Sequence, residues 1–251
     1  MPYVRVKAIA GDVVSEWKYY APRYGKGGSP PGERQAKTSD AQKRRNLKRQ
    51  ERYLALLLDE NFHLYRDGLL TLGWRADSKP TDYEEMMDGV RRFIRTLRPK
   101  YKAAGLELRY VYTLEIGPRG ARHVHMVISH SGAMQAEIMQ AWKGAAPNIR
   151  PLYGNDAGER EFSRLAEYLM KDSYTSSSEK LGRRHYTPSK NLKKPKIITE
   201  VVMANTFSEK LRPRKGYHLD EHSVRSGIHE ETGRAYMEYR YIRDRKGGDD
   251  G

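Results

Sequence analysis

The stretch Arg122-His-Val-His-Met-Val-Ile128 decides the fold and carries the most informative pair of residues in the chain. Because side chains of a strand alternate between its two faces, His123 and His125 point the same way, roughly 6–7 Å apart along the backbone. The apolar residues at positions 124, 126 and 128 then point to the opposite face, into a core. Two imidazoles on one face of a rigid sheet suit a divalent metal ion.

The residues before this stretch predict its partner strand. Tyr110–Ile116 alternates between an apolar or aromatic face and a face that carries Glu115, and Gly117-Pro-Arg-Gly120 is typical of a turn. In an antiparallel hairpin the strands lie about 4.8 Å apart, which brings Glu115 beside His123 and His125. A lone His-x-His pair is weak evidence for a metal site, since exposed strand faces often carry histidines that bind no metal. The added carboxylate predicts a metal site, with Mg²⁺ or Mn²⁺ as the cofactor and open positions for substrate oxygens.

Composition indicates the kind of partner. The 251 residues carry a net charge of +15, with 18 Tyr and 3 Trp that offer stacking surfaces for unpaired bases. We expect a nucleic-acid-binding protein, the alternative being a basic surface without a polyanionic partner. Cysteine is absent, which rules out disulfides and Cys-ligated zinc. No apolar run approaches the ~18 residues of a membrane helix, so we expect no membrane association.

The chain is expected to have three parts. Residues 1–38 are a basic, aromatic, Gly/Pro-rich N-terminal arm, irregular except for at most a short strand near Tyr3–Ile9. Residues 39–180 form the core. Residues 181–251 are a basic extended segment and a C-terminal hairpin, packed on or beside the core.

Periodicity and end signals predict the remaining elements. A capping box at Thr81–Glu84 begins a helix that Pro99 ends after about Leu97. The other expected elements are a basic helix from Ser39 to about Asp59, a strand at Gly68–Trp74, helices at Met134–Trp142 and Glu161–Asp172, and a hairpin of Tyr217–Arg225 with Ala235–Arg243 around Gly233.

Clustered basic residues are the candidate DNA-binding groups. The first helix has almost no acidic residues four positions away from its basic ones, which favours a phosphate-facing role over a solvated helix face. The segment from position 183 to 196 contains no acid. The candidates are Lys43, Arg44, Arg45, Lys48, Arg49, Arg183, Arg184, Lys190, Lys193, Lys194 and Lys196.

The helix at Glu161–Asp172 supplies a candidate nucleophile. Tyr168 and Lys171 are three residues apart, on one flank of its apolar stripe. Attack of a tyrosine on a phosphodiester gives a 5′-phosphotyrosine and a free 3′-hydroxyl, and conserves the bond energy for rejoining. A nearby cation such as Lys171 favours the phenolate. Taken alone, Tyr-x-x-Lys is common by chance, and Tyr168 is equally well explained by packing.

The order of these motifs resembles a known family. Leu70-Thr71-Leu72, His123-Val124-His125 and the pair Tyr168 and Lys171 follow one another as in the HUH endonucleases, specifically the single-tyrosine rolling-circle replication initiators (Rep proteins) of small plasmids and bacteriophages. The basic segment Ser189–Lys196 is similar to that group as well. The resemblance covers about 39–216.

The resemblance implies an α+β fold, with a central antiparallel sheet flanked by helices in an RRM-like or ferredoxin-like arrangement. It also implies a metal on His123, His125 and Glu115, with Tyr168 as the catalytic nucleophile and Lys171 as its assistant. The activity would be metal-dependent nicking and religation of single-stranded DNA that initiates rolling-circle replication, in the cytoplasm of a bacterial host.

The expected partners are single-stranded DNA or an origin hairpin, a host helicase and the replication machinery. The helicase is expected from the host because the 251 residues contain no Gly-x4-Gly-Lys-Ser/Thr phosphate loop. Two alternatives stay open. One is another HUH enzyme, a relaxase or a transposase, and the other is a non-catalytic RRM-like module that binds single-stranded nucleic acid.

Overall fold

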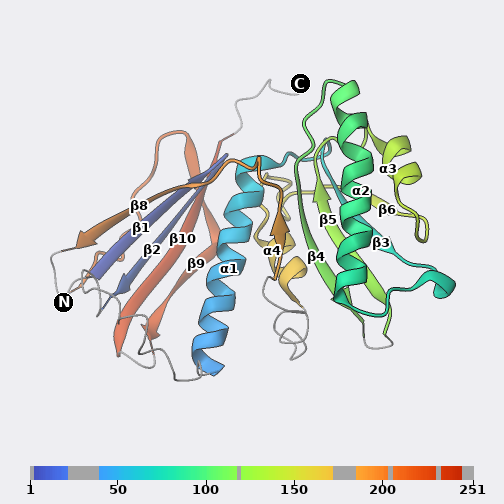
Figure 1. Ribbon diagram of the computed structural model, residues 1–251. Coiled ribbons are helices and arrows are strands. Elements are labelled where there is room, and N and C mark those ends of the chain that lie inside the picture. The colour runs from blue at the N-terminus through green and yellow to red at the C-terminus, as the bar shows by residue number, and fades with distance from the viewer. Residues whose placement is uncertain are drawn as a thin grey trace. The chain divides into compact units, whose positions relative to one another are not determined.

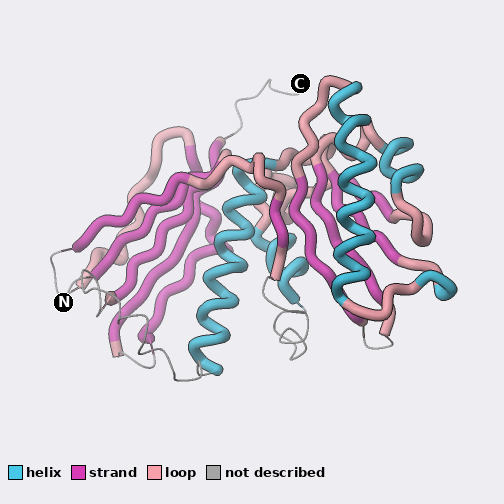
Figure 2. The backbone as a smooth tube through the Cα atoms, in the orientation of Figure 1, coloured by secondary structure: helices cyan, strands magenta, loops and turns pink. Residues whose placement is uncertain are grey.

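The protein has a mixed α+β fold in two compact units. The computed structural model describes residues 3–21, 40–117, 120–171, 185–202, 206–229 and 233–244. One unit combines the chain ends, 1–43 and 194–251, and the other is 44–193 (Figure 1). Within the described residues each unit contains one five-stranded antiparallel sheet (Figure 2). The α+β class is confirmed, and a second sheet accompanies the expected central one. The functional division at 1–38, 39–180 and 181–251 stays a prediction.

The sheet of unit 44–193 has the strand order β6-β3-β5-β4-β7. Its strands are β3 (Gly68–Gly73), β4 (Tyr110–Ile116), β5 (Arg122–Ile128), β6 (Asn148–Pro151) and β7 (Thr187–Pro188). The β4–β5 hairpin forms as predicted, and it pairs Glu115 with His123 and Thr113 with His125. All three candidate metal ligands therefore lie on one face of the sheet.

Helices cover both faces of this sheet. They are α1 (Asp40–Asn61), α2 (Tyr83–Ala103), α3 (Gln135–Ala141) and α4 (Ser163–Met170), with the short helix η2 (Ala76–Ser78) after β3. The even face, with Val124 and Met126, packs against α2 and α3. The odd face, with Val111 and Val127, packs against α1 and α4, on the opposite side in Figure 1. The face that carries Glu115, His123 and His125 is therefore covered by α1 and α4 at the end of the strands where Val111 and Val127 lie.

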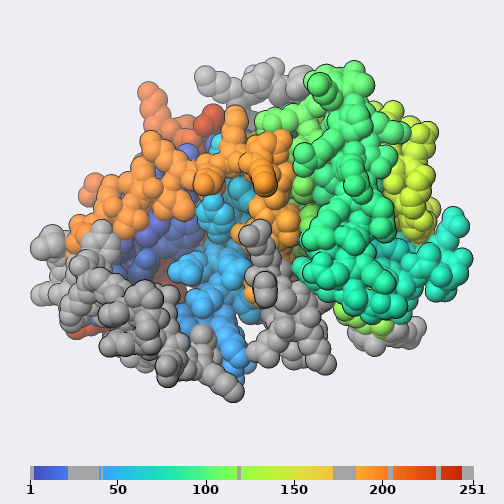
Figure 3. Space-filling model, in the orientation of Figure 1, coloured from blue at the N-terminus to red at the C-terminus, as the bar shows by residue number. Residues whose placement is uncertain are grey.

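Helix α2 begins one residue later and ends later than the sequence predicts. Asp82 caps the helix by accepting a hydrogen bond from the Glu85 amide at 2.9 Å. Pro99 lies inside the helix, which continues to Ala103, so the expected stop at Pro99 is wrong. The reason is tertiary, because Tyr101 is buried and its hydroxyl donates to the Ser129 carbonyl at 2.7 Å. The outer face of α2 lies on the surface, coloured green in Figure 3.

The N-terminal segment is not an irregular arm over residues 3–20. It forms β1 (Tyr3–Ala10) and β2 (Val13–Tyr20), joined by a two-residue turn in which Gly11 has a φ of +55°. Gly-Asp between two alternating runs is a hairpin signal that the composition of the segment obscured.

In the unit formed by 1–43 and 194–251, the strands come from both ends of the chain. The order is β8-β1-β2-β10-β9, with β8 (Lys196–Val202), β9 (Tyr217–His229) and β10 (Arg234–Arg243). The predicted C-terminal hairpin is confirmed, with Gly233 in its turn at a φ of +60°. On one face of the sheet the buried carboxylate of Glu16 accepts hydrogen bonds from Arg5 at 2.7 Å and from the Tyr239 hydroxyl at 2.8 Å. These bonds satisfy the buried charge.

The hydroxyl of Tyr101 provides a test of the packing at the end of α2. We expect Tyr101→Phe to lower the free energy of unfolding by about 1–3 kcal/mol, because the Ser129 carbonyl loses its donor in a buried place. Urea unfolding measures the change. Tyr110→Phe, whose hydroxyl has no such bond to a described residue, is the matched control and should change stability by less. Equal effects of the two substitutions would contradict this role of the Tyr101 hydroxyl.

His130, directly after β5, gives a pH prediction. Burial lowers the pKa of His130 below its ordinary value, and the charge of Arg66 lowers it further. Below pH ~6.5 the unfolded state then binds more protons at this site than the folded state, so stability falls as the pH drops from about 7 to 5. The backbone at His130 has a φ of +53°, which Asn tolerates. We expect urea unfolding of His130→Asn to show a smaller loss of stability over this range than the wild type. Parallel pH curves would contradict the prediction.

Candidate functional site

His125 is the centre of the candidate site. Its side chain is buried, with 7% exposed, and its Nε2 atom is hydrogen-bonded to the Glu115 carboxylate. Its Nδ1 atom lies 3.4 Å from the Thr71 hydroxyl and 3.4 Å from the Tyr168 hydroxyl. Residues of β3, β4, β5 and α4 therefore meet at one imidazole, and together they fix the orientation of the ring.

Packing of α4 brings Tyr168 to this imidazole. Ala166, Leu169 and Met170 are buried in the core on the odd face of the sheet, which holds the helix against it. Tyr168 lies on the flank of that stripe, 38% exposed, and its ring meets the His125 ring edge-on at a centroid distance of 5.3 Å. Tyr168 therefore contacts the sheet while it stays partly exposed.

Lys171 adds a positive charge to the site. It follows α4 directly, and its Nζ atom lies 3.6 Å from Glu115 Oε1. The same ammonium lies 4.7 Å from the centroid of the Tyr168 ring. Lys171 therefore connects the nucleophile candidate with the carboxylate, as a cation between an aromatic ring and an anion.

The carboxyl group of Glu115 is held in its charged form. Burial alone raises the pKa of Glu115, but the hydrogen bond to His125 and the charges of His125 and Lys171 outweigh burial. The pKa of Glu115 is therefore lowered below its usual value. An ionised carboxylate is the form that accepts hydrogen bonds or binds a cation.

His123 shares the face of this cluster at a greater distance. The ring centroids of His123 and His125 lie 6.4 Å apart, and the His123 ring lies against β3, where a Cβ on Gly73 would be 3.5 Å from its Cδ2. Over the described ranges, no group of three or more His, Cys, Asp or Glu side chains is arranged to hold a metal ion. The donor types of Glu115, His123 and His125 fit a divalent cation, which would replace the bond between Glu115 and His125.

Thr71 is a site residue that sequence reasoning missed. In the sequence Thr71 is the middle residue of the Leu70–Leu72 motif, and in the structure it lies directly opposite His125 in the β3–β5 pairing. The alternation of β3 was the available signal, because Leu70 and Leu72 face the core and leave Thr71 on the site face. This alternation identifies Thr71 as a site residue only when β3 is known to pair with β5, and the sequence alone does not predict that pairing.

The candidate DNA-binding residues lie on exposed surface where the structure describes them. Two of them have acidic partners three positions away: Lys43 lies 3.4 Å from Asp40, and Lys48 pairs with Glu51. The exposed residues are Lys43, Arg44, Arg45, Lys48, Arg49, Lys190, Lys193, Lys194 and Lys196. Arg183 and Arg184 lie outside the described residues. The DNA-binding role of the set stays a prediction.

Part of the chain matches a family of known proteins. Residues 67–174 match the model of the replication-associated protein ORF2/G2P family. This range, less than half of the chain, contains Thr71, Glu115, His125, Tyr168 and Lys171. The match supports a role in DNA replication and is consistent with a replication initiator, which implies interaction with DNA.

No curated protein and no solved structure matches the chain significantly. None of the helices in the described ranges is long and apolar enough to cross a membrane.

Proposed function

We propose that this protein is a metal-dependent, site-specific endonuclease and ligase for single-stranded DNA that initiates rolling-circle replication, with Tyr168 as its nucleophile. The observation that carries the proposal is the position of the Tyr168 hydroxyl, 3.4 Å from His125 Nδ1, within a cluster that also contains Glu115 and Lys171. The match to a replication-associated family over the same residues supports it.

The reaction transfers one phosphodiester bond. The Tyr168 oxygen forms a bond to the phosphorus, and the bond from the phosphorus to the 3′ oxygen breaks. The phenol proton leaves to solvent, and the departing 3′ oxygen takes up a proton, which gives a 5′-phosphotyrosine and a free 3′-hydroxyl. The reverse attack by a 3′-hydroxyl rejoins the strand and releases the tyrosine.

Each residue of the cluster has a role in this proposal. His125 orients the Tyr168 hydroxyl through its Nδ1 atom, and Thr71 holds the same ring from β3. Lys171 places a positive charge near the Tyr168 ring, where it would help to position the scissile phosphate. The 38% exposure of Tyr168 leaves the nucleophile accessible to a DNA strand.

Glu115, His123 and His125 would hold the cation, Mg²⁺ or Mn²⁺. When bound, it would polarise the scissile phosphate and orient it toward the nucleophile. The basic residues of α1 and of the segment 190–196 would bind the DNA backbone at the origin hairpin. Unwinding would depend on a host helicase and the host replication machinery.

Substitution of the nucleophile tests the proposal directly. We expect the wild-type protein with Mn²⁺ and labelled single-stranded DNA from candidate origins to form a covalent protein–DNA band on a denaturing gel. Tyr168→Phe should abolish the band, because only the hydroxyl oxygen can bond to phosphorus. Tyr153→Phe is the matched control, since Tyr153 is also exposed, at 64%, and lies outside the cluster.

Two results would overturn this mechanism. The first is no covalent band from the wild type on any candidate origin while the DNA is still bound, which would favour a non-catalytic single-strand-binding protein. The second is an undiminished band from Tyr168→Phe.

Metal binding is a second test, independent of nicking. We expect calorimetric titration with Mn²⁺ to show one site, with affinity weakened about tenfold or more in His123→Ala and in Glu115→Gln, because each loses a ligand. His130→Asn removes a histidine outside the cluster and should bind Mn²⁺ as the wild type does. Equal affinities for all four proteins would contradict the assignment of these ligands.

A further inference from the structure

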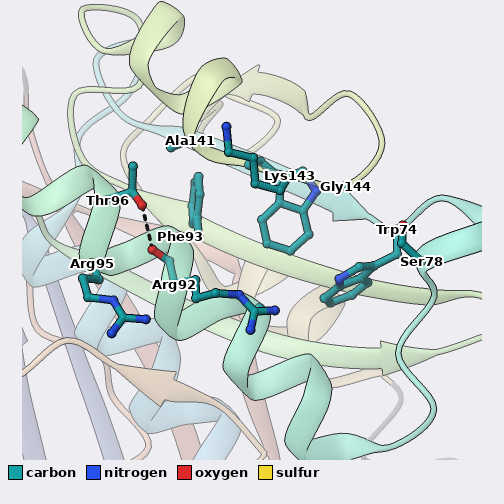
Figure 4. Close-up of a pocket in the computed structure, with 11 residues that line it drawn as sticks. Trp74, Ser78, Arg92, Phe93, Arg95, Thr96, Ala141, Lys143 and Gly144 are labelled. Atoms are coloured by element: carbon teal, nitrogen blue, oxygen red, sulfur yellow. Dashed lines mark hydrogen bonds between the residues drawn. The ribbon is translucent and has the colours of Figure 1, made fainter.

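A pocket of about 520 Å³ lies between α2, α3 and the segment after β3. Its walls include three aromatic side chains, Trp74, Phe93 and Trp142. Figure 4 shows Arg92 and Arg95 on the α2 side of the pocket and Lys143 on the side of α3. The pocket therefore combines stacking surface with positive charge.

The aromatic wall is built by specific contacts. The rings of Trp74 and Trp142 meet edge-on at 5.1 Å, and those of Phe93 and Trp142 at 5.5 Å. The Trp142 indole donates to the Gly73 carbonyl at 2.8 Å, which fixes its ring plane. A Cβ on Gly89 would lie 3.1 Å from Trp74, so the absence of a side chain there lets the indole approach α2. Trp74 stays partly exposed at the pocket.

The charges at the pocket are not neutralised locally. Arg92 and Arg95 are exposed, and neither has an ion pair with any carboxylate in the described part of the chain. Among the described residues, the Lys143 ammonium donates to a backbone carbonyl, that of Gln140, at 3.2 Å, and pairs with no carboxylate. Arg91, one position earlier on α2, differs, because it pairs with Asp88 at 2.7 Å. Unneutralised cations around an aromatic wall suit a ligand that has both flat rings and negative charge.

The pocket begins at the end of β3 that borders the candidate active site. Gly73 is the last residue of β3 and pairs with His123, and Trp74 is the next residue. The Gly73 carbonyl accepts a hydrogen bond from Trp142, and a Cβ on Gly73 would lie 3.5 Å from the His123 ring. The pocket lies with α2 and α3 on the face of the sheet opposite the histidines, so a DNA strand whose scissile phosphate lies at the histidines would pass around this end of β3 to place a neighbouring nucleotide in it.

We propose that this pocket binds an unpaired nucleobase of single-stranded DNA. The base stacks on Trp74, and its flanking phosphates lie against Arg92, Arg95 and Lys143. The assignment of this strand as the one that is nicked rests on the proposed function, whereas the binding itself does not require nicking. Unpaired bases are favoured over duplex because a base within a duplex cannot present its face to an indole.

The test is equilibrium binding of fluorescein-labelled oligothymidylate by anisotropy, over a series of salt concentrations and without divalent metal. We expect Trp74→Ala to weaken binding about tenfold and Trp74→Phe, which keeps a stacking ring, to restore most of it. Arg92→Ala should weaken binding and reduce the slope of log K against log salt concentration by about 0.7, the value for one phosphate contact on a single strand. Arg91→Ala, which removes the same charge from the same helix, should leave that slope unchanged.

The outcomes separate this proposal from the proposed function. Two results would overturn the pocket assignment. One is a salt slope for Arg92→Ala equal to that of Arg91→Ala. The other is wild-type affinity of Trp74→Ala for oligothymidylate. An equal loss of binding to duplex DNA in the pocket variants would overturn the assignment of an unpaired base. If the pocket variants lose single-strand binding while Tyr168→Phe keeps its covalent band, the pocket assignment stands and the nucleophile assignment fails.

Discussion

The antiparallel register between β4 and β5 determines where every residue of the candidate site lies. Glu115 pairs with His123 and Thr113 with His125, so the carboxylate and both imidazoles share one face. A slip of one residue in either strand would move its side chains to the other face. That face is packed with apolar side chains of α2 and α3, where a charged or polar group without partners costs several kcal/mol. The hydrophobic core therefore enforces the register on which the chemistry depends.

A second apolar core, on the site face itself, supplies the candidate nucleophile. Val111 and Val127 lie on the same face as the histidines, further along the strands, and the buried side of α4 packs over them. Because α4 is held there by Ala166 and Leu169, Tyr168 on its flank is directed at His125. The site lies at the border between this core and solvent. That place explains how His125 is buried while Tyr168 is partly exposed.

Local patterns predicted most of unit 44–193, and long-range pairing accounts for what they missed. The alternation of residues 110–128 predicted the hairpin and the common face of Glu115 and the histidines, and the structure adds the register. The contact of Thr71 with His125 depends on β3 pairing with β5, across more than fifty residues, which periodicity does not encode. Pro99 was misread because the buried Tyr101 two residues later outweighs the local cost of proline in a helix.

The sheet of the other unit was predicted only in part, as its C-terminal hairpin, for a related reason. Its N-terminal strand β1 pairs with β8, and β2 pairs with β10, so its strands are joined across the whole intervening unit. Local patterns at residues 3–20 can predict the β1–β2 hairpin, but they do not encode the pairings of β1 with β8 and of β2 with β10, whose strands lie near the other end of the chain. The Gly/Pro-rich composition of the following residues then made the whole segment look irregular.

This connectivity makes the two units unequal. Unit 44–193 is continuous in sequence and has its own sheet and two hydrophobic cores, whereas the other unit is assembled from both ends of the chain. Pairing strands so distant in sequence costs loop-closure entropy, and that cost falls when the intervening residues are already compact. The residues that match a replication-associated family, 67–174, lie entirely within the continuous unit, together with the candidate site and the aromatic pocket. The chemistry proposed for this protein therefore depends on contacts within the continuous unit. Strand β3 connects the candidate site with the pocket: Thr71 contacts His125 in the site, and the Gly73 carbonyl accepts a hydrogen bond from Trp142 at the pocket.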